Sequence, residues 1–290
     1  MPSKIYSNKN VYEAAQERLQ YIFDTFENVL VAFSGGKDSG VLLNLAYDYA
    51  KSNNMLDKLA MYHLDYEAQY TETTKYVTEC FNSYPGIKKM WICMPVTVPC
   101  AVSVTESYWI PWDPEKKDIW ARDMPNNEHV INIDNAPFKL VSGTADYTFQ
   151  ADFNEWFADQ NGSTVVLIGI RTDESLNRYR AIASDKKVHT YNNKSYLVGN
   201  SHVCSAYPIY DWSVEDVWIA NARFGYSYNR LYDLMYQAGL TIHQMRVASP
   251  FLSQGAESLK MYKVIEPNMW AKLLGRVNGV NFAGIYGGTT

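Results

Sequence analysis

The segment 34–39, which reads Ser-Gly-Gly-Lys-Asp-Ser, carries the clearest chemistry of this chain. Its two glycines lack a Cβ, so the backbone can turn sharply there and bring its amides close to a ligand. Its serines add hydroxyl donors, and Lys37 adds a cation. The carboxylate of Asp38 fits beside an anion when a magnesium ion or a helix N-terminus lies next to it. The segment therefore predicts a phosphate or sulfate site. The residues predicted to bind the anion are Ser34, Gly35, Gly36, Lys37, Asp38 and Ser39.

Charged residues also follow two other apolar runs of the sequence. Asp65 comes directly after Leu59–Leu64, and a carboxylate there is either an exposed turn residue or part of a ligand site. Arg171 follows Thr164–Ile170, and an arginine can hold a phosphate or sulfate through two parallel hydrogen bonds. A salt-bridged loop is the alternative, but parallel strands bind ligands at their carboxyl ends, so we favour the ligand. The residues assigned to it here are Gly169, Arg171, Glu174, Ser175, Arg178 and Arg180.

These residues require a framework of alternating strands and helices. The run Val29–Phe33 is apolar throughout, as in a strand buried on both faces. After the segment 34–39, apolar residues recur at helical spacing, with Asn44 and Asp48 expected on the other side. The pattern predicts an α/β protein with a doubly wound, mostly parallel, Rossmann-like sheet and helices on both faces. Strands are expected at Val29–Phe33, Leu59–Leu64, Lys88–Met94 and Thr164–Ile170. Further helices are expected at Asn10–Phe26, Tyr70–Phe81 with Thr71 as its cap, Ala151–Gln160, after the cap residue Ser213, at Asn229–Gly239 and from Ala256 to about Leu274.

The composition narrows the function classes. The 290 residues are 47% hydrophobic and 20% charged with a net charge of −5, so charge gives no support for nucleic-acid binding. No apolar run approaches a membrane span, and the N-terminus lacks the apolar core of a signal peptide, which predicts a cytoplasmic protein. The four cysteines form no Cys-x-x-Cys pair and are expected to be reduced thiols of the core. A homo-oligomer is left open.

The segment 34–39 is not a Walker P-loop, which has four residues between its glycines and then Gly-Lys-Ser/Thr. It resembles the Ser-Gly-Gly-x-Asp-Ser pyrophosphate loop (PP-loop) of the adenine nucleotide α-hydrolase superfamily, which includes the N-type ATP pyrophosphatases. Four sequence blocks occur in the order found in its phosphoadenosine phosphosulfate (PAPS) reductase-like family, in the sulfotransferase/reductase-like branch. The blocks are Ser34–Ser39, Leu64–Asp65 with Tyr70–Thr73, Gly169–Arg171 with Glu174–Ser175, and Pro208–Trp212 with Asp216–Trp218.

The resemblance implies that the loop binds the anionic end of ATP or PAPS. It implies that Phe33 and Leu64 bracket the adenine and that Asp65 lies near the nucleotide or a Mg²⁺ ion. Arg171 and Glu174 would then hold the second side of the anion, or the ribose. The implied catalytic residues are Lys37, Asp38 and Arg171, and the implied magnesium ligands are Asp38 and Asp65.

On this resemblance, residues 29–240 form a PP-loop nucleotide-binding domain. A helix within residues 1–28 precedes it, and a helical or irregular extension, 241–290, follows it. Residues 95–149 contain prolines that exclude long regular elements, and we interpret them as an insertion. The insertion is expected to be a lid or a partner-protein surface, with peripheral packing as the alternative. Its aromatic group comprises Tyr108, Trp109, Trp112 and Trp120.

The chain also departs from the reductases of that family, which attack sulfur with a cysteine near the C-terminus. Cys204 is its last cysteine and is expected to be a buried structural thiol, so neither a thiol-based reductase nor an iron–sulfur cluster is expected, and no flavin is expected. The leading hypothesis is an adenine-nucleotide enzyme that cleaves ATP at the α–β phosphate bond or acts on an adenylyl sulfate. The alternatives are a PAPS sulfotransferase or reductase that uses a partner thiol, and a nucleotide-sensing subunit of a protein complex.

Overall fold

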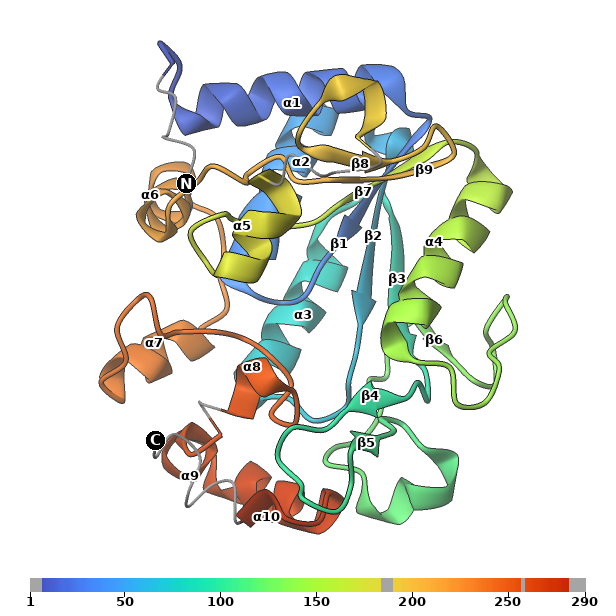
Figure 1. Cartoon of the computed structure of the whole chain (residues 1–290), viewed down its shortest axis with the longest axis vertical. Helices are drawn as coiled ribbons and strands as arrows, with labels where there is room; N and C mark the ends of the chain where they lie inside the picture. The colour runs from blue at the N-terminus through green and yellow to red at the C-terminus, as the bar shows by residue number, and fades with distance from the viewer. Residues whose placement is uncertain (1–6, 184–189, 257–258, 282–290) are drawn as a thin grey trace.

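A seven-stranded sheet forms the centre of the protein. The computed structural model describes residues 7–183, 190–256 and 259–281, and its main sheet has the order β6-β3-β2-β1-β7-β9-β8 (Figure 1). Neighbouring strands are parallel except β8, which runs antiparallel to β9. The predicted α/β fold with a mostly parallel sheet is confirmed. The strands are β1 (Asn28–Ala32), β2 (Leu59–Leu64), β3 (Lys88–Cys93), β6 (Val130–Asn132), β7 (Thr164–Leu167), β8 (Leu197–Gly199) and β9 (Val203–Ala206).

Helices cover both faces of the sheet, which explains why its strands are apolar without alternation. Along β1, Val29 and Val31 belong to the core on one face, and Leu30 belongs to the core on the other. The first core includes side chains of α1 (Val11–Thr25), α2 (Lys37–Ser52), α3 (Thr71–Ser83) and α6 (Val214–Phe224). The second core includes side chains of α4 (Asp146–Asn161), α7 (Leu231–Gln237), α9 (Met261–Ile265) and α10 (Pro267–Arg276). The remaining helical segments are α5 (Leu176–Ala183), α8 (Ser253–Ala256), and the 3₁₀ turns η1 (Leu56–Lys58), η2 (Pro114–Ile119) and η3 (Tyr191–Asn193).

Helix ends and faces follow the sequence prediction in part. Ser213 caps α6, as predicted. Thr71 does not cap α3 but is its first residue, and Glu266 accepts hydrogen bonds from its amide at 2.8 Å and its hydroxyl at 3.0 Å. Asn44 of α2, expected away from the apolar stripe, is buried and accepts a hydrogen bond from the hydroxyl of Tyr84 at 2.9 Å. Both corrections arise from partners that are distant in the sequence.

The insertion 95–149 is more integrated than its sequence indicates. Its strand β6 pairs in parallel with β3 and extends the main sheet, and β4 (Val98–Pro99) pairs with β5 (Tyr108–Trp109) in a small antiparallel ribbon. Trp109 and Trp112 are buried, and the Trp109 ring packs edge-on against Phe251 with 4.7 Å between ring centroids. Tyr108 is 61% exposed. The two buried tryptophans therefore pack inside the molecule, in line with the packing alternative, and a lid or partner role for the rest of the insertion stays a prediction.

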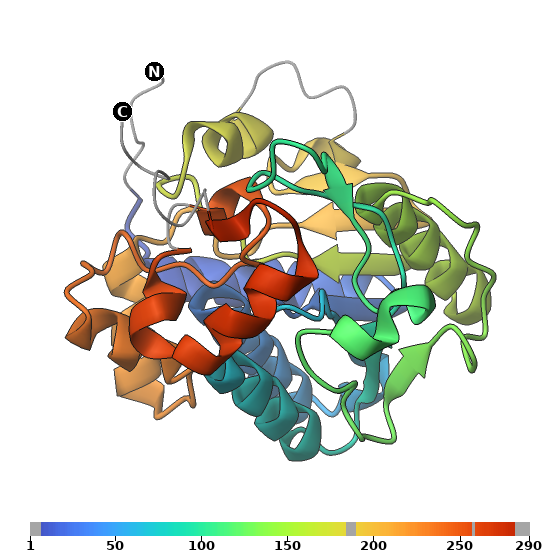
Figure 2. The same ribbon diagram turned by 90° about the horizontal axis from the view of Figure 1, so that it is seen from below.

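The C-terminal part contains two short helices where one was predicted. Helix α9 ends at Ile265, and α10 begins at Pro267, whose missing amide hydrogen interrupts a continuous helix. Figure 2, seen from below, shows these helices in front of the end of the sheet toward which β2 points. No helix in the described part of the chain is long and apolar enough to cross a membrane.

Candidate functional site

The loop 34–39 lies where strand β1 passes into helix α2. Gly35 has a φ of 76°, a left-handed conformation that residues with a Cβ rarely adopt, so the predicted sharp turn is present. The hydroxyls of Ser34 and Ser39 lie 2.9 Å apart and tie the two ends of the loop together. Helix α2 begins at Lys37, so the amides of its first turn have no acceptor within the helix and favour an anion in front of them.

Gly169 brings the end of strand β7 against this loop. A Cβ built on Gly169 would lie 2.9 Å from the amide nitrogen of Ser39 and 3.0 Å from the carbonyl carbon of Asp38. Strands β1 and β7 are neighbours, and the strands that follow each of them lie on opposite sides of the pair. The loops after β1 and β7 therefore meet at a topological switch point, where open α/β sheets bind ligands. Gly169 makes this approach possible through its lack of a side chain.

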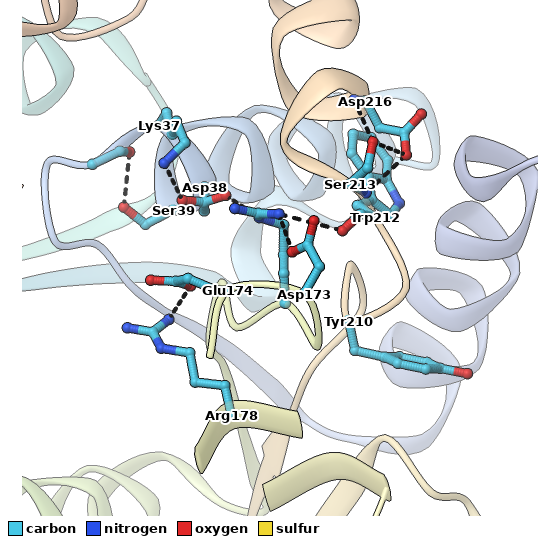
Figure 3. A network of polar contacts seen from close by, with 12 residues as sticks. Lys37, Asp38, Ser39, Asp173, Glu174, Arg178, Tyr210, Trp212, Ser213 and Asp216 are labelled. Carbon is cyan, nitrogen blue, oxygen red and sulfur yellow. Dashed lines mark hydrogen bonds and ion pairs between the residues drawn. The ribbon is translucent and has the colours of Figure 1, made fainter. Parts of the chain in front are cut away.

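The carboxylate of Asp38 lies between two cations. Arg171 Nε is 2.5 Å from Asp38 Oδ1, and Lys37 Nζ is 3.2 Å from Oδ2. Arg171 also pairs with Asp173, and Figure 3 shows Lys37, Asp38 and Asp173 in this network. Burial alone would lower the pKa of Arg171, but Asp38 and Asp173 outweigh burial and raise that pKa. Arg171 is thus firmly positioned, with its charge already balanced by the protein.

A cavity of about 600 Å³ opens beside this network. It is lined by Ser34 of the loop, by Leu64 at the end of β2, and by Glu174, Ser175 and Arg178 from the segment after β7. Its volume is in the range of small-molecule sites. The structure therefore brings five of the predicted residues to one cavity.

A second cavity, of about 150 Å³, adjoins the first. Glu174 and Arg246 line both cavities, while Lys37 and Arg171 line the smaller one. The smaller cavity therefore lies next to the loop, and its lining combines three cations with the carboxylates of Asp173 and Glu174. Such a cavity suits a phosphate or sulfate group.

Glu174 lies where the two cavities meet. Arg178 Nη1 is 2.6 Å from Glu174 Oε2 (Figure 3). Burial raises the pKa of Glu174, Arg178 lowers it and Asp38 raises it further, so that the pKa lies above its ordinary value. A negative ligand beside Glu174 would raise this pKa again.

Several residues of the site come from the last quarter of the chain, where no site residue was predicted. The hydroxyl of Tyr232 accepts a hydrogen bond from the amide of Lys37 at 3.0 Å, and the carbonyl of Met245 accepts one from Lys37 Nζ at 3.4 Å. Arg246 donates to the carbonyl of Glu174 at 2.9 Å. These contacts join positions about seventy or more residues apart, so the local sequence carried no signal for them.

His63 is a further residue that the sequence prediction missed. It lines the larger cavity, and its Nδ1 lies 2.8 Å from the carbonyl of Phe33. A carbonyl only accepts, so Nδ1 carries the proton of the neutral ring and Nε2 is an acceptor. Burial lowers the pKa of His63, which favours this neutral form. A histidine inside the apolar run Leu59–Leu64 was the available signal.

Eight of the predicted residues line neither cavity. Five of them are the loop residues Gly35, Gly36, Asp38 and Ser39 and the adjoining Gly169, and the other three are Phe33, Arg180 and Asp65. Phe33 is buried in the core, where its ring packs against Tyr76 with 5.7 Å between centroids, and its contact with an adenine stays a prediction. Arg180 is exposed on α5. Asp65 directly follows the last residue of β2 and is completely buried.

Asp65 belongs to an ionic network in the interior. Arg122 Nη2 lies 2.6 and 2.5 Å from its two carboxylate oxygens, and Trp91 Nε1 donates to it at 2.8 Å. Burial alone would raise the pKa of Asp65, but Arg122, His63 and these hydrogen bonds hold it below its ordinary value.

The two carboxylates predicted to hold magnesium are thus both engaged by arginines. Asp38 pairs with Arg171, and Asp65 pairs with Arg122. Within the described ranges, no group of three His, Cys, Asp or Glu side chains could hold a metal ion. Either carboxylate would have to share or release its arginine to bind a magnesium ion, and their role as magnesium ligands stays a prediction.

The four cysteines are free and buried, as predicted. Burial raises the pKa of the Cys80 thiol to about 12 and that of Cys204 to about 11. Thiols of this kind are poor nucleophiles because the thiolate is scarce at neutral pH.

Comparisons with known proteins show what this chain is similar to. The family model "Phosphoadenosine phosphosulfate reductase domain" matches residues 28–98 and 123–238, and "Domain of unknown function (DUF3440)" matches residues 239–290. The chain is 37% identical over 283 residues to "Uncharacterized protein YbdN" of Escherichia coli (strain K12), which covers 96% of this chain and 68% of that protein.

Three solved structures match this chain over most of its length. A phosphoadenylyl-sulfate (PAPS) reductase from Candida auris is 14% identical with a TM-score of 0.41, covering 80% of this chain and 94% of that one. An FMN adenylyltransferase from Candida glabrata is 12% identical with a TM-score of 0.42, covering 79% and 62%. An NH3-dependent NAD synthetase from Campylobacter jejuni is 8% identical with a TM-score of 0.40, covering 95% and 97%.

Proposed function

The chain belongs to the phosphoadenosine phosphosulfate reductase domain family, and we propose on that basis that it binds an adenine nucleotide and acts on it as an enzyme. The reaction would be cleavage of ATP between the α- and β-phosphates, or a reaction of an adenylyl sulfate such as PAPS. One observation carries the proposal: the loop 34–39 adjoins two joined cavities, and the smaller of them is lined by Lys37, Arg171 and Arg246. A glycine loop, a helix N-terminus and three cations thus lie around the smaller cavity.

In the proposed complex, the larger cavity holds the nucleoside and the smaller cavity holds its anionic end. The hydroxyl of Ser34 and the amides of Asp38 and Ser39 in the first turn of α2 donate to phosphate or sulfate oxygens, while the amide of Lys37 donates to Tyr232. Lys37 and Arg171 stabilise the negative charge that grows on the leaving group as its bond to the nucleotide breaks, the kind of contact whose loss costs about 10²- to 10³-fold in rate. His63 Nε2 accepts a hydrogen bond from the nucleoside, whose donors are the amino group of the base and the ribose hydroxyls.

A PAPS sulfotransferase or reductase is the second candidate. The burial of the cysteines limits the source of the sulfur acceptor in this reaction. The described structure offers no exposed thiol near the cavities, so the sulfur acceptor or reductant would come from a partner. A partner protein at residues 95–149, a homo-oligomer and a cytoplasmic location stay predictions.

Binding and turnover measured together test the proposal. Calorimetry with ATP, PAPS and adenosine should show binding of an adenine nucleotide, and labelled ATP should release AMP and pyrophosphate in the presence of magnesium. Lys37→Ala should lower turnover by about 10²-fold. Sulfate transfer from PAPS without ATP cleavage would select the second candidate. Binding without turnover of either nucleotide would favour a nucleotide-sensing subunit, and no binding at all would overturn the proposal.

A further inference from the structure

Arg246 differs from the other lysine and arginine residues that line the two cavities. Lys37 and Arg171 pair with Asp38, and Arg178 pairs with Glu174. No carboxylate within the described part of the chain pairs with Arg246, although it lines both cavities. A half-buried guanidinium whose charge no carboxylate balances is a strong site for an anion.

We propose that Arg246 binds a phosphate or sulfate oxygen of the nucleotide at the junction of the two cavities. The segment 240–252 then forms a wall of the binding site, which gives a role to residues in the part of the chain matched by a domain of unknown function. The inference rests on the proposed nucleotide binding and specifies which side chain makes the main charged contact.

The backbone around Arg246 lies directly over the loop. The carbonyl of Met245 accepts a hydrogen bond from Lys37 Nζ at 3.4 Å, and a Cβ built on Gly36 would lie 3.9 Å from Cβ of Val247. Arg246 itself is oriented by its hydrogen bond to the carbonyl of Glu174. Its side chain is therefore held beside Glu174, where it lines both cavities.

The guanidinium group of Arg171 is less available to a ligand than that of Arg246. Its Nε donates to Asp38, and its Nη1 donates to Asp173 and, at 3.4 Å, to the carbonyl of Trp212. A bidentate contact from Arg171 to a ligand would first have to release a carboxylate. Arg246 donates one bond to a neutral carbonyl, and the rest of its five N–H groups have no described partner.

The test is calorimetric binding of adenosine, AMP, ATP and PAPS to the full chain and to two variants. Arg246→Ala should weaken binding of the three anionic nucleotides by about 10- to 100-fold and leave adenosine binding nearly unchanged, since a hydrogen bond to a charged group is worth about 1.5–3 kcal/mol. Arg246→Lys keeps the charge and should recover part of the loss. Arg223→Ala, an exposed arginine at the end of α6, is the matched control and should bind like the parent chain.

The outcomes separate this inference from the proposed function. If the parent chain binds ATP or PAPS and Arg246→Ala binds it equally well, the role of Arg246 is wrong while nucleotide binding stands. If adenosine binding falls as much as ATP binding, Arg246 supports the wall structurally and the inference is again wrong. If the parent chain binds no nucleotide, the proposed function itself fails.

Discussion

At the scale of single residues, the cavities combine cations with carboxylates that already balance most of them. Asp38 pairs with Lys37 and Arg171, Asp173 pairs with Arg171 as well, and Glu174 pairs with Arg178. An anionic ligand must compete with these carboxylates or change their protonation. The site is therefore expected to respond to pH through the carboxylate that is easiest to protonate.

Glu174 is that carboxylate, because burial raises its pKa above the ordinary value. An anion bound beside it raises the pKa further, so binding should be coupled to proton uptake and should strengthen as the pH falls from about 7 toward about 5. Glu174→Gln removes the negative charge. It should bind ATP about fivefold more tightly at neutral pH and show less of this pH dependence.

Calorimetry across this pH range, in buffers that differ in ionisation enthalpy, measures both effects. The phosphates of ATP and His243 in the smaller cavity are present in both proteins, so the difference between them reports on Glu174. Equal proton uptake by the two proteins would contradict the prediction.

Asp65 should contribute to stability instead of binding. Its pKa in the folded protein lies below the ordinary value, so its contribution is complete above about pH 4 and is lost as the pH falls through the folded-state pKa. Asp65→Asn leaves Arg122 without its carboxylate and should cost about 3–5 kcal/mol at neutral pH. As the pH falls below about 4, the unfolding free energy of this variant should decrease less steeply than that of the parent chain, because the variant has no carboxylate to protonate at this position.

Urea unfolding at several pH values between about 3 and 7 measures these quantities. A variant as stable as the parent chain at neutral pH would show that the Arg122 pairing contributes little.

At the scale of elements, the approach of β7 to α2 builds the site. A methyl group on Gly169 would meet the backbone of Ser39 and Asp38, at 2.9 and 3.0 Å, and backbone cannot rotate away. Gly169→Ala should therefore destabilise the fold by about 1–3 kcal/mol and weaken nucleotide binding, because the loop after β7 shifts from the loop 34–39.

Thermal unfolding and calorimetry measure the two effects. Gly275→Ala in α10 is the control, since a Cβ there meets nothing within 4 Å and alanine favours a helix. Unchanged stability and binding in Gly169→Ala would mean that the two loops adjust independently.

The sequence predicted the elements whose signal is local. Strand β2 was predicted with its observed bounds, Leu59–Leu64, because this mostly apolar run, with His63 as its one polar residue, is bounded on both sides by charged residues. Strand β6 was missed because its three residues, Val130–Asn132, owe their conformation to pairing with β3. The break between α9 and α10 had a local signal in Pro267, and the predicted single helix overlooked it.

The site residues also divide into those with a local sequence signal and those that distant parts of the chain bring to the site. Ser34, Glu174 and Arg178 stand in or beside recognisable motifs and do line the larger cavity. Asp65 also stands in a motif, but Arg122 of the insertion occupies its carboxylate. Arg246 reaches the site through the fold of the C-terminal part, which no pattern in its own neighbourhood predicted.

At the scale of the whole molecule, the C-terminal part is held to the sheet by buried polar contacts as well as by apolar packing. Arg276, at the end of α10, donates to Glu67 just beyond β2 at 2.7 and 2.9 Å, and to the carbonyl of Ile110 in the insertion at 2.6 Å. Glu67 also accepts hydrogen bonds from the amides of Trp112 and Ala121. One completely buried carboxylate thus joins the insertion, the sheet and the last helix.

This junction predicts that a change far from the cavities will weaken both folding and binding. Arg276→Met removes the cation that pairs with the buried carboxylate of Glu67, which keeps only its two backbone amide donors, and should cost about 3–5 kcal/mol of unfolding free energy. Because α10 and the segment carrying Arg246 pack in one core, nucleotide affinity should fall in the same variant. Adding Glu67→Gln removes the unpaired charge while keeping an acceptor for the amides, so the double variant should recover part of the stability. Lys272→Met, at an exposed position of the same helix, is the control. Urea unfolding with parallel calorimetry measures both effects, and a loss of stability without a loss of affinity would mean that the wall around Arg246 holds its place independently of α10.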